Sequence, residues 1–98
     1  MSAPAINHYA AAERYANGAM ERFRFMRAVN GFDPAEVLGP SDRRLLMRLL
    51  VTEWRWSDRQ IERHTKWTLS VVARIREDLW LQPCSGENTL IPPPEWTD

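Results

Sequence analysis

The sequence predicts a mainly α-helical protein of one domain, and three observations lead to this fold class. Apolar residues recur at steps of three and four along most of the chain, which is the spacing of one face of an α-helix. Ser, Thr and Asp stand where such periodic stretches begin, as helix N-caps do. A chain of 98 residues supplies one hydrophobic core with little to spare, which excludes a second independent domain.

Residues 1–40 form an N-terminal helical segment of the domain. Residues 1–7 contain a proline and small side chains, and we expect them to be an arm without fixed structure. A helix is expected over residues 8–29, kinked or divided near Gly18, because glycine costs about 1 kcal/mol relative to alanine inside a helix. Its apolar stripe either covers the core of the same chain or pairs with a second copy in a homodimer. The stripe consists of Tyr9, Ala12, Ala16, Ala19 or Met20, Phe23 and Met26.

The next helices are predicted from capping signals. Asp33 can cap a short helix that has Pro34 at its first position, and a glycine-proline pair then ends it. Ser41 is expected to cap a longer helix over residues 42–54. Apolar side chains cover most of its circumference, so it should lie between the N-terminal helix and the later helices. The polar stripe left on it comprises Arg44, Arg48 and Arg55.

Two short helices separated by a brief interruption are predicted next. Ser57 and Gln60 have the spacing of a capping box, so the first of these helices is expected over residues 58–65. Thr68 is a suitable N-cap for the second helix, over residues 69–80. The apolar face of this second helix consists of Val72, Ile75 and Leu79. Its opposite face, which is left free for recognition, consists of Ser70, Ala73, Arg74 and Glu77.

Residues 41–80 resemble the helix-turn-helix DNA-binding domains of phage and bacterial regulators, including their three-helix homeodomain-like and winged variants. The apolar positions of that family are matched by Ile61, Trp67, Val72 and Ile75. Ser70 and Arg74 match its contacts to phosphate and base edges. Glu62 and Lys66 depart from the family, which usually has a small alanine and a left-handed glycine there. Lysine in that conformation costs about 1 kcal/mol relative to glycine.

The distribution of charge agrees with this resemblance better than the total does. The chain has 13 basic and 13 acidic residues, so its net charge is zero. Residues 1–40 are neutral, whereas residues 41–80 hold nine basic and six acidic residues, a net charge of +3. The positive charge therefore lies on the segment that resembles a DNA-binding unit.

The resemblance implies two groups of residues that contact double-stranded DNA. Base contacts are expected from Leu69, Ser70, Ala73 and Arg74, with Leu69 against a thymine methyl group and Arg74 bidentate to guanine. Backbone contacts are expected from Arg44, Arg55, Arg59, Lys66 and Thr68. A solvated or ion-paired surface position is the alternative for each arginine, and it is favoured more for the other arginines than for Arg74. Glu77 and Asp78 oppose nearby phosphates, so the N-terminal end of the second helix should enter the groove.

Residues 81–98 change in composition. They are compatible with a short β-hairpin, which would be a small wing, or with an extended tail that packs on the domain. Three consecutive prolines at 92–94 restrict any strand pairing. Trp96 would anchor such a tail or be presented to a protein partner. The other tryptophans (Trp54, Trp56, Trp67 and Trp80) are expected to pack in the core rather than stack on bases.

The sequence offers no set of residues that indicates catalysis, a metal site or a cofactor. His8 and His64 are far apart, and His64 with Cys84 does not have metal-ligand spacing. No glycine-rich phosphate loop or nucleophile motif is present. A single cysteine excludes an intrachain disulfide, and no apolar run reaches the ~20 residues needed to cross a bilayer. We therefore expect a non-enzymatic, cytoplasmic protein without a membrane segment.

The function expected from these features is sequence-specific transcriptional regulation by a DNA-binding protein of phage or mobile-element type. Two alternatives stay open. One is an accessory DNA-organising factor, such as an excisionase or a small packaging subunit. The other is a protein-interaction module on a helix-turn-helix scaffold, with which the zero net charge is compatible.

Overall fold

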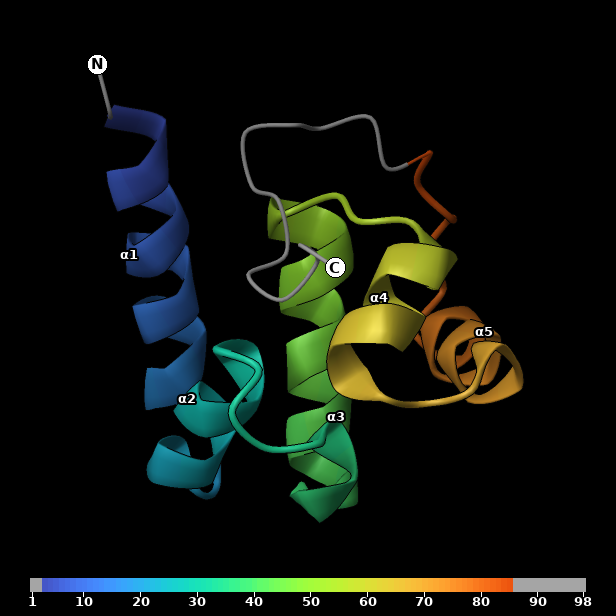
Figure 1. Cartoon of the computed structure of the whole chain (residues 1–98), viewed down its shortest axis with the longest axis horizontal. Coiled ribbons are helices and arrows are strands. Elements are labelled where there is room, and N and C mark those ends of the chain that lie inside the picture. The colour runs from blue at the N-terminus through green and yellow to red at the C-terminus, as the bar shows by residue number, and fades with distance from the viewer. Residues whose placement is uncertain (1–2, 86–98) are drawn as a thin grey trace.

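The computed structural model describes residues 3–85, with side chains described from residue 10 onwards. Within that range the chain forms helices joined by turns, so the mainly α fold is confirmed (Figure 1). In chain order the elements are α1 (Ala3–Asn17), α2 (Arg22–Val29), the 3₁₀ turn η1 (Ala35–Val37), α3 (Pro40–Arg48), the π-helical turn η2 (Leu49–Glu53), α4 (Asp58–Thr65) and α5 (Leu69–Asp78).

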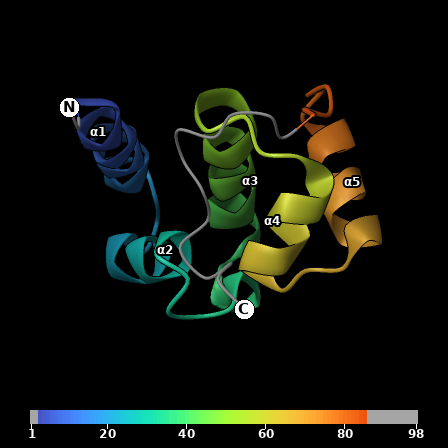
Figure 2. The same ribbon diagram turned by 45° about the horizontal axis from the view of Figure 1, so that its top comes forward.

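The helix α3 with its continuation η2 lies at the centre of the molecule. Helices α1 and α2 lie on one side of it and α4 and α5 on the other, as two views agree (Figures 1 and 2). The predicted central position of this helix is therefore confirmed. Its last turn is π-helical, because the N–H of Trp54 donates to the carbonyl of Leu49, five residues earlier, at 3.1 Å. Arg55, expected on the polar stripe of the helix, instead comes after the π-turn with a φ of 58°.

The N-terminal segment differs from prediction in two respects. Helix α1 begins at Ala3, so an arm without structure over residues 3–7 is wrong. The chain is divided after Asn17, as expected near Gly18, but the break changes the helical phase in which α2 starts. Phe23, expected in the core stripe, is therefore 74% exposed. Of the alternatives Ala19 and Met20, Ala19 packs against the core and Met20 is 79% exposed. The buried residues of α2 are Phe25, Ala28 and Val29.

The core fills the space between α3 and its two neighbouring layers. Helix α1, which buries small alanines, contacts η2, whereas α2 contacts η1 and α3. The buried members include Ala11, Ala12, Ala16, Leu46, Met47, Leu49, Leu50, Trp54, Trp56, Ile61, Trp67 and Val72. The rings of Trp54 and Trp56 lie 5.1 Å apart, and Trp56 meets the buried ring of His64 edge-on at 5.0 Å. Three tryptophans are in the core as predicted, whereas for Trp80, which is 92% exposed, the prediction is wrong.

The start of α3 corrects another prediction. Gly39 is the N-cap and Pro40 the first helical residue, so Ser41 lies inside the helix and does not cap it. The buried carboxylate of Asp42 instead accepts the backbone N–H groups of Met20 at 2.8 Å and Glu21 at 3.0 Å. These groups precede α2, where a negative charge also complements the helix dipole. Asp42 therefore joins the N-terminal layer to the central helix.

Asp33 likewise has a different partner from the one expected. Its carboxylate binds the guanidinium of Arg27 with two contacts, at 2.7 and 3.2 Å, and does not cap a helix. The hydrogen bond from Arg27 holds the pKa of Asp33 below its usual value. The segment after Pro34 is accordingly only a 3₁₀ turn.

The C-terminal prediction lies largely outside the described residues. Residues 81–85 form no regular secondary structure. The first strand of the expected hairpin, at residues 81–83, is therefore not formed, and the rest of the hairpin or extended tail, with the anchor at Trp96, lies outside the described residues. None of the helices in the described part is long and apolar enough to cross a membrane.

Candidate nucleic-acid interface

The first helix of the predicted pair begins with the capping box that its sequence indicates. The hydroxyl of Ser57 accepts the N–H of Gln60 at 3.2 Å, and the side chain of Gln60 accepts the N–H of Ser57 at 2.8 Å. Two N–H groups at the start of α4 are thus satisfied locally. This confirms both the start of the helix and its cap.

The turn between α4 and α5 is fixed by backbone and side-chain hydrogen bonds. Lys66 adopts the left-handed conformation with a φ of 70°, as the resemblance noted in the sequence implies, and its N–H donates to the carbonyl of Glu62 at 2.9 Å. The buried hydroxyl of Thr65 donates to Ile61 at 2.7 Å and accepts the N–H of Trp67 at 3.2 Å. The Thr68 side chain accepts the N–H of α5's third residue, confirming its predicted role as N-cap.

A partly buried ion pair links α5 to the start of α4. The guanidinium of Arg76 binds both carboxylate oxygens of Asp58, at 2.8 and 2.9 Å, and donates to the carbonyl of Leu81 at 3.0 Å. The Arg76 side chain is only 9% exposed. The hydrogen bond to Asp58 raises the pKa of Arg76 above its usual value. Sequence reasoning missed this contact, because each residue alone resembles an ordinary surface charge.

The two faces of α5 are divided as predicted. Val72 is buried, and Ile75 and Leu79 pack partly buried against the core. On the opposite face Ser70, Arg74 and Glu77 are exposed and Ala73 is half-buried. Two apolar side chains near the start of the helix, Leu69 and Val71, are also exposed, to 37% and 38%. The first two turns of α5 therefore present hydroxyl, aliphatic and guanidinium groups together.

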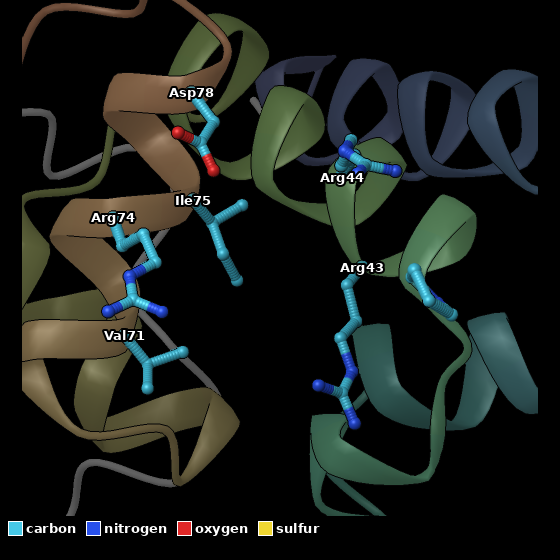
Figure 3. A pocket seen from close by; sticks show the side chains of 7 residues that line it. Arg43, Arg44, Val71, Arg74, Ile75 and Asp78 are labelled. Carbon is cyan, nitrogen blue, oxygen red and sulfur yellow. The ribbon is translucent and has the colours of Figure 1, made fainter.

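An open groove of about 280 Å³ runs between this helix and α3 (Figure 3). One wall is formed by α5 and the other by the N-terminal end of α3. The lining residues are Pro40, Arg43, Arg44, Val71, Arg74, Ile75 and Asp78. Arginines from both walls outnumber the single carboxylate, so the groove carries net positive charge. Arg43 is committed to the fold, because its guanidinium donates to the carbonyls of Leu38 at 2.8 Å and Glu36 at 2.7 Å.

The structure brings some of the predicted contact residues together and leaves others apart. Arg44 and Arg74 line the same groove, and the remaining base-contact candidates share α5 with Arg74. Lys66 and Thr68 lie exposed in the turn before that helix. Arg55 and Arg59 are exposed around the start of α4 and do not line the groove.

Sequence reasoning also missed Val71 and Asp78 as neighbours of Arg74. A signal was available, because both lie one turn from Arg74 along a helix, at spacings of three and four residues.

No group of three or more His, Cys, Asp and Glu side chains among the described residues is placed to hold a metal ion. Comparison of the chain with protein-family models, with curated proteins and with solved structures finds no match.

Proposed function

We propose that the protein is a sequence-specific DNA-binding regulator that places the N-terminal half of α5 in the major groove. The observation that carries this proposal is the exposed face in the N-terminal half of α5, which presents Ser70, Val71 and Arg74. A helix fits the major groove, where an arginine can bind guanine with two hydrogen bonds and an aliphatic group can contact a thymine methyl.

The arrangement of charge along α5 determines the direction of approach. Arg74 lies before the acidic pair Glu77 and Asp78, which occupies the last turn of the helix. If the N-terminal half enters the groove, these acids lie farther from the phosphates. Arg44 on the opposite wall of the groove, with Lys66 and Thr68 in the turn, would then contact the DNA backbone.

The proposal is tested by selecting duplexes from a random library at several salt concentrations. We expect enrichment of one sequence, with an affinity that falls steeply as salt rises. Arg74→Ala should lose about 1–3 kcal/mol of discrimination at one base position. Arg22→Ala is the matched control, because Arg22 is an exposed arginine on α2, on the far side of α3. No enrichment at low salt, or equal losses in both variants, would contradict this function.

A protein-interaction role is the second candidate, favoured by one observation. Trp80 is 92% exposed and comes after the acidic end of α5, a position that the proposed DNA contact does not use. A DNA-organising factor would combine the two activities, since it binds DNA and also assembles. Measurement of the bound complex's size separates a regulator, which protects a short site, from a factor that covers DNA in larger assemblies.

A further inference from the structure

The cap of α5 places a tryptophan where a helix favours glycine. The N–H of Trp80 donates to the carbonyl of Glu77 at 3.0 Å, and the N–H of Leu81 donates to that of Arg76 at 3.1 Å. These two bonds form a Schellman motif, whose left-handed residue is usually glycine. Trp80 adopts that conformation with a φ of 60°. A bulky side chain is unfavourable there, and the fold gains little from it because the indole is 92% exposed.

Acidic side chains accompany Trp80 at the end of α5. Glu77 and Asp78, in the last turn of α5, are both exposed. Arg76, the basic residue of that turn, is buried and bound to Asp58. The end of α5 therefore presents an aromatic ring with two carboxylates, which we call the acidic end patch (Glu77, Asp78 and Trp80). It is complementary to a surface that carries arginine and apolar side chains.

The same chain has a surface of that kind around α2. Met20 and Phe23 are exposed to 79% and 74%, and Phe32 to 66%. The guanidinium of Arg27 lies over both phenyl rings, 5.9 Å from the centre of Phe23 and 5.5 Å from that of Phe32, while it also forms the ion pair with Asp33. Arg24 is also exposed, and its ion pair with Glu21 at 3.2 Å is open to solvent and therefore weak. We call this surface the basic aromatic patch (Met20, Phe23, Arg24, Arg27 and Phe32).

The two patches cannot meet within one molecule. Helices α2 and α5 lie on opposite sides of α3 (Figures 1 and 2), with the central core between them. Ala12 and Ala16 of α1, which a dimer through the N-terminal helix would use, are themselves buried in the core. The exposed surface around α2 is open to a second copy.

We propose that copies of this chain associate head to tail, with the acidic end patch of one copy on the basic aromatic patch of the next. Such a contact is heterologous, so repeated addition gives either a ring or an open filament. Trp80 is the anchor, stacking against phenyl and guanidinium groups, while Glu77 and Asp78 meet Arg24 and share Arg27 with Asp33 of the next copy. The contact leaves the N-terminal half of α5 free, and it stands whether or not the protein binds DNA.

The first test is the molar mass of the full chain by sedimentation equilibrium from micromolar to millimolar concentration, without DNA. We expect mass to rise with concentration and the association to weaken with added salt. Trp80→Gly should weaken association at least about tenfold, as loss of an interface anchor does, while raising the melting temperature because glycine suits the left-handed position. Lys66→Gly is the matched control, since it makes the same change at the end of α4 and should leave association unchanged.

A mixing experiment identifies the head-to-tail geometry. Phe23→Asp disrupts the other patch at an exposed position, so it should weaken association by a similar factor. Trp80→Gly and Phe23→Asp each retain one intact patch. Their equimolar mixture should therefore form a one-to-one dimer that grows no further. A wild-type monomer at all concentrations, a Trp80→Gly chain that assembles like wild type, or a mixture that stays monomeric would each overturn the proposal.

Discussion

The ion pair between Arg76 and Asp58 gives the sharpest prediction about stability. In the Arg76→Met variant an unbranched apolar side chain keeps the packing of the Arg76 stem, but three charge-assisted hydrogen bonds are lost, two to Asp58 and one to the carbonyl of Leu81. Breaking a fully buried pair costs about 3–5 kcal/mol, because a charge is left uncompensated. Asp58 retains access to water, with a side chain 25% exposed, which reduces the loss. We therefore expect the free energy of unfolding to fall by about 2–4 kcal/mol.

Urea unfolding followed by circular dichroism measures this change. Arg74→Met is the matched control, because Arg74 lies on the same helix but is exposed, and surface substitutions usually change stability by less than about 0.5 kcal/mol. A double-mutant cycle with Asp58→Asn should give a coupling of about 1–3 kcal/mol. Equal stabilities for the Arg76 and Arg74 variants would show that the ion pair does not hold α5 in place.

Three further changes test other parts of the fold. Lys66→Gly should raise the free energy of unfolding by about 0.5–1 kcal/mol, because glycine adopts the left-handed conformation freely. Lys66→Ala should not raise it, and thermal unfolding of the two variants measures the difference. Asp42→Asn should lower the free energy of unfolding by about 1–2 kcal/mol, because an amide has one uncharged acceptor oxygen where the carboxylate has two charged ones for the N–H groups before α2. An unchanged midpoint of urea unfolding would refute this role. Burial and then the charge of Glu53 raise the pKa of Tyr15 in the folded protein, so the unfolded chain loses the phenolic proton at a lower pH. The free energy of unfolding should therefore fall as pH rises above about 10, and it should fall less in Tyr15→Phe. Parallel profiles of stability against pH for the two proteins would contradict this.

The features that the sequence predicted correctly are those that depend on interactions between residues close together in the chain. The capping box of Ser57 and Gln60, the N-cap at Thr68 and the left-handed position of Lys66 each depend on neighbours along the chain. The division of the faces of α5 results from helical periodicity alone. For the same reason the candidate base-contact residues lie together on one helix.

The features that sequence did not predict depend on contacts between distant segments. Asp42 resembles part of an ordinary helix start, but it is buried against the backbone before α2, 22 residues away from Met20 in sequence. The exposed position of Phe23 depends on the phase in which α2 restarts after the break, which periodicity across residues 8–29 could not give. The size of Trp80 predicts a place in the core, although its left-handed backbone directs it to the surface.

The bond between His64 and Val29 has a consequence for anyone who wishes to reuse this molecule. The ring nitrogen Nε2 of His64 lies 2.8 Å from the carbonyl oxygen of Val29, which only accepts, so a residue of α4 relies on the last residue of α2. Asp42 relies on the backbone before α2 in the same way. A fragment cut at residue 40 would leave both buried polar groups without these partners. The smallest portable unit therefore includes the N-terminal layer, and a fusion protein has to carry α1 and α2 with it.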